Sequence, residues 1–189
     1  KQPIRSAYGV QQAGFIACHN FSFLERYDVL GALKPGGVFL LNSPYGADEV
    51  WDHLPRAVQQ QIIERRAEFY TLDASRIAQN VGLGRRINII MQAAFFKISG
   101  VLPEEQAMPM IAAAVEDTYG FRGPMIVQMN IRAAEIGVER IERVQYPLAV
   151  TSTLPMRPPV PAHAPEFART VTGEIIARRG DHLPVSLMP

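Results

Sequence analysis

The sequence has only one cysteine, Cys18, among its 189 residues. A single thiol cannot form an internal disulfide, and it cannot supply the cysteines of an iron–sulfur cluster or of a four-cysteine zinc site. The chain also lacks a strong net charge, since its formal balance is +1 at pH 7. Such a chain has no overall field that would attract nucleic acid or an anionic membrane. We therefore expect neither partner, and we expect a reducing, cytoplasmic setting.

Long apolar runs and common active-site motifs are absent as well. No run approaches the ~20 residues of a membrane span, and the N-terminal KQPIRSAYGV has no signal-peptide pattern. There is no GxSxG, P-loop or GxGxxG motif, and His53, His163 and His182 have no partners at metal-ligand spacing. We expect no catalytic residue and no metal ligand in this chain. Because there is no initiator Met, we also expect a piece of a longer protein.

The residues that are present predict an α/β domain. Hydrophobic residues make up 48% of the chain, enough for a sizeable core. Helical periodicity covers Phe23–Leu33 and Asp48–Arg66, with Pro55 opening the second half of the latter. These segments alternate with three apolar runs that predict buried strands, Ala13–Asn20, Gly37–Leu41 and Ala67–Leu72. Alternation at this spacing predicts right-handed crossovers, a mostly parallel sheet and a three-layer α/β fold.

The second half of the sequence predicts helices and then a proline-rich linker. The helical stretches are Arg86–Ser99, Pro103–Tyr119 with a kink or restart at Pro109, and Arg122–Val144. Six prolines lie between residues 147 and 165, which predicts an extended linker over Gln145–Ala164. A short helix is expected at Glu166–Arg179. We divide the chain into a domain of residues 1–145 and a linker with a short helix, residues 146–189, that leads to a following domain.

Polar residues follow each predicted strand, in His19–Phe23, Asn42–Gly46 and Asp73–Ser75. Ligands of open parallel sheets bind beyond these carboxyl ends. Helix capping explains Asn20, Ser43 or Asp48, and Asp73 equally well.

Cys18 and His19 are adjacent on a predicted strand. Their side chains point to opposite faces, so they cannot form a thiolate–imidazole pair. We expect Cys18 to be a buried, inert thiol and His19 to cap or pack.

Five segments together resemble one known family. They are CHNFSFLERYDVL, GGVFLLNSP, VWDHLP, RINIIMQAAFFKISGVLP and the final GDHLPVS. They resemble the central part of pyruvate:ferredoxin (flavodoxin) oxidoreductases, equivalent to the gamma subunit of multi-subunit 2-oxoacid oxidoreductases. The resemblance runs from Pro3 to Ser186, and it implies that the opening β–α units of the gamma-type domain are missing from this chain.

The resemblance implies an enzyme that converts pyruvate and coenzyme A to acetyl-CoA and carbon dioxide and passes electrons to ferredoxin or flavodoxin. It uses thiamine diphosphate, magnesium and [4Fe–4S] clusters, and the resemblance places all of them in other domains of the same polypeptide. The full-length enzyme is expected to be a homodimer. The gamma-type domain is linked to assembly and coenzyme A binding, so we expect the isolated chain to be inactive.

The stretch Gly82–Gly100 combines glycines, arginines and an apolar helix. Glycines allow a close approach of a ligand, and the first turn of a helix favours an anion. Coenzyme A is the anion that the resemblance implies, and its expected contacts are Arg86, Asn88, Gln92, Gly84 and Lys1.

Two alternatives stay open at this point. In the first, the chain is a purely structural assembly domain whose arginines pair with carboxylates of a neighbouring domain. In the second, it is a free-standing module that binds coenzyme A or a nucleotide. Arg85 stands where the family often has a second glycine, so no family role is carried over to it.

Overall fold

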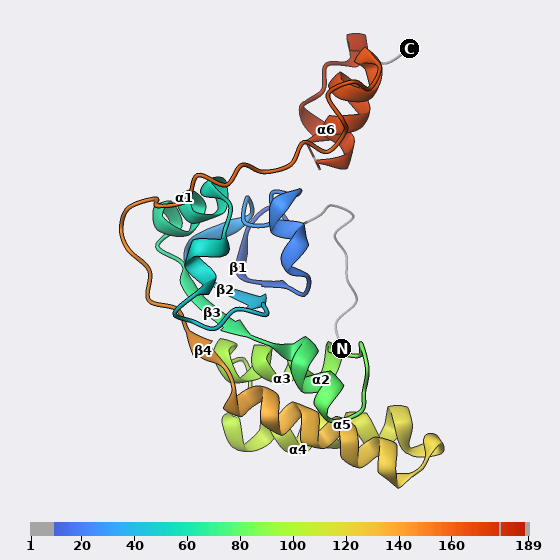
Figure 1. Ribbon diagram of the computed structural model, residues 1–189. Coiled ribbons are helices and arrows are strands. Elements are labelled where there is room, and N and C mark those ends of the chain that lie inside the picture. The colour runs from blue at the N-terminus through green and yellow to red at the C-terminus, as the bar shows by residue number, and fades with distance from the viewer. Residues whose placement is uncertain (1–9, 178, 188–189) are drawn as a thin grey trace.

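A mostly parallel sheet of four strands forms the centre of the structure, a computed structural model that describes residues 10–177 and 179–187 (Figure 1). The parallel strands are β1 (Ala13–Cys18), β2 (Leu33–Asn42) and β3 (Glu68–Leu72). The two-residue β4 (Glu142–Arg143) pairs antiparallel with β3, which gives the order β1-β2-β3-β4. The predicted α/β class and parallel sheet are confirmed.

One face of the sheet is covered by α1 (Arg56–Arg65) and by two 3₁₀ helices, Phe21–Glu25 and Val50–His53. Side chains alternate along a strand, so Phe39 and Leu41 of β2 pack on this face, with Phe69 of β3 stacked on Phe39 at 5.1 Å between ring centroids.

The opposite face is covered by α2 (Ala74–Asn80), α3 (Asn88–Ser99) and α5 (Pro124–Glu139). Leu40 and Leu72 point to this side. The last long helix, α4 (Glu104–Tyr119), packs on the outer side of α3 and α5 (Figure 1). The sheet is therefore enclosed between two helical layers, as the sequence predicts.

The expected helix over Phe23–Leu33 is wrong. Only Phe21–Glu25 is helical, as a 3₁₀ turn, and Leu33 already belongs to β2. The guanidinium of Arg65 on α1 donates hydrogen bonds to the carbonyls of Gly31 and Leu33. These carbonyls bond to a side chain, and the segment buries Leu24, Leu30 and Leu33 with isolated turns in place of a continuous helix.

The helices of the second half differ from the sequence prediction in three respects. No break occurs at Pro109, since α4 continues from Glu104 to Tyr119. The stretch predicted as Arg122–Val144 is α-helical only over Pro124–Glu139, after a 3₁₀ helix that ends at Arg122, and α3 begins at Asn88 rather than at Arg86. Gly137 is buried inside α5.

The proline-rich segment wraps over the α1 side of the sheet (Figure 1). Tyr146 stacks on Trp51 at 5.2 Å between ring centroids, and the Leu154 carbonyl accepts a hydrogen bond from the Arg56 amide. Beyond it, π-helical residues Ala168–Thr172 and α6 (Gly173–Ile176) form the short helix expected there.

The edge strand β1 leads to a first testable prediction. Among residues 10–177 and 179–187, no strand pairs with the outer edge of β1. Free strand edges pair with other chains, so we expect the 189-residue chain to self-associate in light scattering at high concentration. Ala17→Lys, which places a charge at an exposed position of β1, should reduce this association, whereas Gln60→Lys on α1 should not. A strictly monomeric parent chain would contradict the prediction.

Candidate functional site

Asn42, the last residue of β2, connects the carboxyl ends of the parallel strands. Its Nδ2 donates hydrogen bonds to the His19 carbonyl at 2.9 Å and to Ser75 Oγ at 3.0 Å. Its Oδ1 accepts from the Ser75 amide at 3.4 Å. The Asn42 amide thus joins the loops after β1 and β3 to the end of β2. Because Asn42 is only 7% exposed, these hydrogen bonds are shielded from solvent.

A cavity of about 410 Å³, which we call the strand-end cavity, opens beside Asn42. Its wall comes from all three parallel strand ends and from the segment before α3. The residues that line it include His19, Asn20, Asn42, Asp73, Ser75, Gln79, Gly84, Arg85 and Ile87. A ligand there would lie where ligands of open parallel sheets bind.

The turn before α3 is built by two glycines with positive φ, Gly82 at 82° and Gly84 at 62°. Residues with a Cβ rarely adopt this conformation, so glycine is required at both positions for an unstrained turn. Leu83 between them is 4% exposed and fixes the turn to the core. The two glycines therefore set the backbone turn that leads into α3.

The residues expected to contact coenzyme A divide into two groups. Gly84 lines the strand-end cavity, together with Arg85. Arg86, Asn88 and Gln92 are exposed and are not among the residues that line it. Lys1 lies outside the described residues.

Arg85 and Arg86 are both exposed, and their side chains have no hydrogen-bond or ion-pair partner among the residues that the structure describes. The Arg86 amide donates to the Leu83 carbonyl at 3.3 Å. The first turn of α3 follows directly, so two unpaired guanidiniums lie next to the positive end of a 12-residue helix. This arrangement favours an anion.

Two of the expected caps are present and one is not. Asn20 accepts a hydrogen bond from the Ser22 amide at 3.1 Å, and Asp73 accepts from the Arg76 amide at 2.8 Å. Asp48 caps no helix, since Glu49 occupies the position before Val50–His53. Ser43 instead holds a turn by accepting from the Tyr45 amide at 3.0 Å.

Cys18 and His19 do not form a catalytic pair. The Cys18 thiol donates to the Asn20 carbonyl at 3.2 Å and is 3% exposed, and burial raises its pKa. Partial burial lowers the pKa of His19 from its ordinary value. A buried, protonated thiol is a poor nucleophile, as expected from the sequence.

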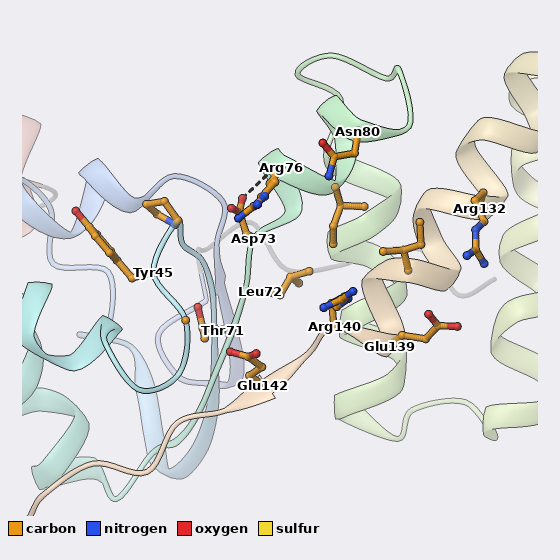
Figure 2. Close-up of a pocket in the computed structure, with 14 residues that line it drawn as sticks. Tyr45, Thr71, Leu72, Asp73, Arg76, Asn80, Arg132, Glu139, Arg140 and Glu142 are labelled. Carbon is orange, nitrogen blue, oxygen red and sulfur yellow. Dashed lines mark hydrogen bonds between the residues drawn. The ribbon is translucent and has the colours of Figure 1, made fainter.

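A second cavity, of about 580 Å³, also has Asp73 in its wall (Figure 2). We call it the α2–α5 cavity. Among the residues that line it, α2 contributes Arg76 and Asn80, and α5 contributes Arg132 and Glu139. Arg140 is the residue directly after α5. Sequence reasoning missed this cavity, because its residues are ordinary surface residues of helices that are far apart in the chain.

The described part of the chain contains no set of side chains that could bind a metal ion or an iron–sulfur cluster. Residues 10–177 and 179–187 contain no group of three or more His, Cys, Asp or Glu side chains that could hold a metal ion. The one thiol is buried, so the residues of this chain do not fit a [4Fe–4S] cluster. None of the described helices is long and apolar enough to cross a membrane.

Comparison with protein families identifies the chain. A family model described as pyruvate ferredoxin/flavodoxin oxidoreductase matches residues 1–140. The chain belongs to the pyruvate ferredoxin/flavodoxin oxidoreductase family. The resemblance seen in the sequence is thereby confirmed. A second model, EKR, described as a domain of unknown function, matches residues 153–189.

Individual relatives agree with the family. The pyruvate-flavodoxin oxidoreductase of Rhodospirillum rubrum is 45% identical over 189 residues, which is 100% of this chain. The pyruvate:ferredoxin oxidoreductase of Moorella thermoacetica is 44% identical over 186 residues, 98% of this chain. In both cases the chain spans only 16% of the relative's own length.

The fold also matches a solved structure. The pyruvate oxidoreductase subunit PORC of Thermotoga maritima superposes with a TM-score of 0.56, covering 72% of this chain and 67% of that one. The two share 18% sequence identity, so the likeness supports the fold.

Proposed function

We propose that this chain is the gamma-type domain of a pyruvate:ferredoxin/flavodoxin oxidoreductase, which oxidatively decarboxylates pyruvate to acetyl-CoA. The observation that carries the proposal is the family match over residues 1–140. Thiamine diphosphate, magnesium and the [4Fe–4S] clusters belong to other domains of the same polypeptide, and those domains also meet ferredoxin or flavodoxin. The single buried cysteine supports this division. The enzyme acts as a cytoplasmic homodimer, and residues 146–189 lead to its following domain.

Within that enzyme, the domain contributes to assembly and binds coenzyme A at the start of α3. Gly84 lets the ligand approach the backbone, while Arg86, Asn88 and Gln92 lie on the exposed side of the turn and of α3. Two unpaired guanidiniums beside a helix start support a phosphate-bearing ligand. Arg85 joins the proposed contacts because it lines the strand-end cavity next to Gly84. Lys1 completes the set carried over from the sequence.

Kinetics of the full-length enzyme that contains this chain test the coenzyme site. Arg86→Ala should raise the apparent KM for coenzyme A about ten- to a hundredfold, because losing a charge-assisted contact costs roughly 1.5–3 kcal/mol. Reduction of the clusters by pyruvate without coenzyme A should be unchanged. Arg122→Ala, at an exposed arginine in the 3₁₀ helix that follows α4, is the matched control and should change neither quantity.

The kinetic test, together with a binding measurement on the 189-residue chain, separates the alternatives. A purely structural domain predicts an unchanged KM in a well-folded Arg86→Ala enzyme. A free-standing coenzyme A or nucleotide-binding module predicts tight binding to the 189-residue chain and no pyruvate oxidation by any longer polypeptide that contains it.

A further inference from the structure

The α2–α5 cavity brings together two arginines that no described residue neutralises. Arg76 extends from α2 and Arg140 from the end of α5, and both line the cavity. Neither guanidinium has a hydrogen-bond or ion-pair partner among the residues that the structure describes. Figure 2 shows the two side chains on either side of Leu72, whose own side chain is 2% exposed. Two positive groups therefore border an apolar floor.

The other charged groups of this cavity are already engaged or lie at its far side. Arg132 forms an ion pair with Glu135 at 3.2 Å. Asp73 accepts a hydrogen bond from the Arg76 amide at 2.8 Å, and Glu142 accepts one from the Ala47 amide at 2.9 Å. Backbone donors of this kind offset part of a carboxylate's charge. Figure 2 shows the remaining carboxylate, Glu139, on the Arg132 side.

We propose that the α2–α5 cavity binds a small organic oxyanion, a carboxylate or a phosphate ester, with its charged group between Arg76 and Arg140. Guanidiniums bind both oxyanions bidentately, which is the chemistry that these two side chains share. A volume of about 580 Å³ lies within the range of small-molecule sites. The apolar floor of Leu72 and Ile77 accommodates the uncharged part of the ligand. This site is separate from the start of α3 and does not depend on coenzyme A binding there.

Calorimetric titration of the 189-residue chain tests the proposal. The background is Arg85→Gln with Arg86→Gln, which removes the two arginines before α3, and the probes are pyrophosphate and succinate. We expect at least one probe to bind this background. Adding Arg76→Gln or Arg140→Gln should weaken that binding at least about tenfold, the effect of losing a charge-assisted contact. Adding Arg132→Gln, at an arginine of the same cavity that is already paired, should change it less than about twofold.

Each outcome has a definite meaning. Binding of pyrophosphate alone assigns a phosphate ester, binding of succinate alone assigns a carboxylate, and binding of both supports the shared oxyanion chemistry. The proposal is overturned if neither probe binds the background variant at concentrations up to about 10 mM, since a site with a millimolar Kd would be largely occupied there. Equal losses in all three added variants would also overturn it. Unchanged circular dichroism and melting temperature confirm that each variant is folded. If the coenzyme site before α3 proves absent, these results are unaffected.

Discussion

Replacing Gln59 with leucine is expected to lower the free energy of unfolding by about 3 kcal/mol, because it leaves several buried polar groups without partners. Gln59 on α1 is completely buried. Its Oε1 accepts hydrogen bonds from the Thr151 and Ser152 amides, both at 2.9 Å, and its Nε2 donates to the Trp51 carbonyl at 2.8 Å. Leucine fills a similar volume and makes none of these bonds.

The substitution should also release the proline-rich segment from α1. Gln59 joins residues 151–152 to the body of the domain, so its loss should expose the segment around Thr151 to limited proteolysis. Chemical denaturation measures the stability change, and mass spectrometry locates the first cuts. Gln60→Leu on the same helix is the matched control, since Gln60 is exposed and its side chain donates a hydrogen bond to the exposed Glu64 at 2.7 Å. Equal stability of the Gln59 and Gln60 variants would refute the role of Gln59.

Replacing Gly137 with alanine is expected to destabilise the domain by about 1–3 kcal/mol through overpacking, although alanine favours helix. A Cβ at Gly137 would lie 2.7 Å from Ile90 Cγ2 and 3.4 Å from the Ile90 carbonyl. Ile90 is fully buried in the core between α3 and the sheet. The two helices would have to separate, because the Cγ2 methyl of the buried, β-branched Ile90 lies too close to the new Cβ and has no free space to move into, whereas the carbonyl is at ordinary contact distance.

A double-mutant cycle isolates this contact. Ile90→Ala alone should cost about 2–5 kcal/mol, since it empties a buried site. In that background Gly137→Ala should become neutral or stabilising by up to about 1 kcal/mol, because only the helix preference of alanine remains. Urea denaturation of the four chains gives the coupling energy. A higher melting temperature for Gly137→Ala in the parent chain would contradict the prediction.

Several features were predictable from local sequence because their causes are local. The apolar runs near Phe15, Val38 and Phe69 form the three parallel strands, since buried strands need continuous apolar residues. The stripe that includes Ile90, Met91 and Ala94 forms the buried face of α3. Positive φ at Gly82 and Gly84 follows from residues that lack a Cβ.

Other features were not predictable because their partners are distant in the chain. The segment after Phe23 has helical periodicity, but the carbonyls of Gly31 and Leu33 at its end bond to Arg65 instead. Likewise the helix does not restart at Pro109, since α4 continues through it. Neither outcome is encoded within a window of one helix, because tertiary contacts override local preference.

The sequence by itself determined the family, the α/β class, the parallel strands and the glycine turn before α3, because strand burial, helix periodicity and backbone freedom depend on neighbouring residues. Tertiary structure alone decided which charges share a cavity. The turn at Gly84 places Arg85, and not Arg86, in the wall of the strand-end cavity, and the packing of α5 beside α2 brings Arg140 to the same cavity as Arg76. Cavities are formed between elements, so their lining depends on how helices and strands pack, which short-range patterns do not encode.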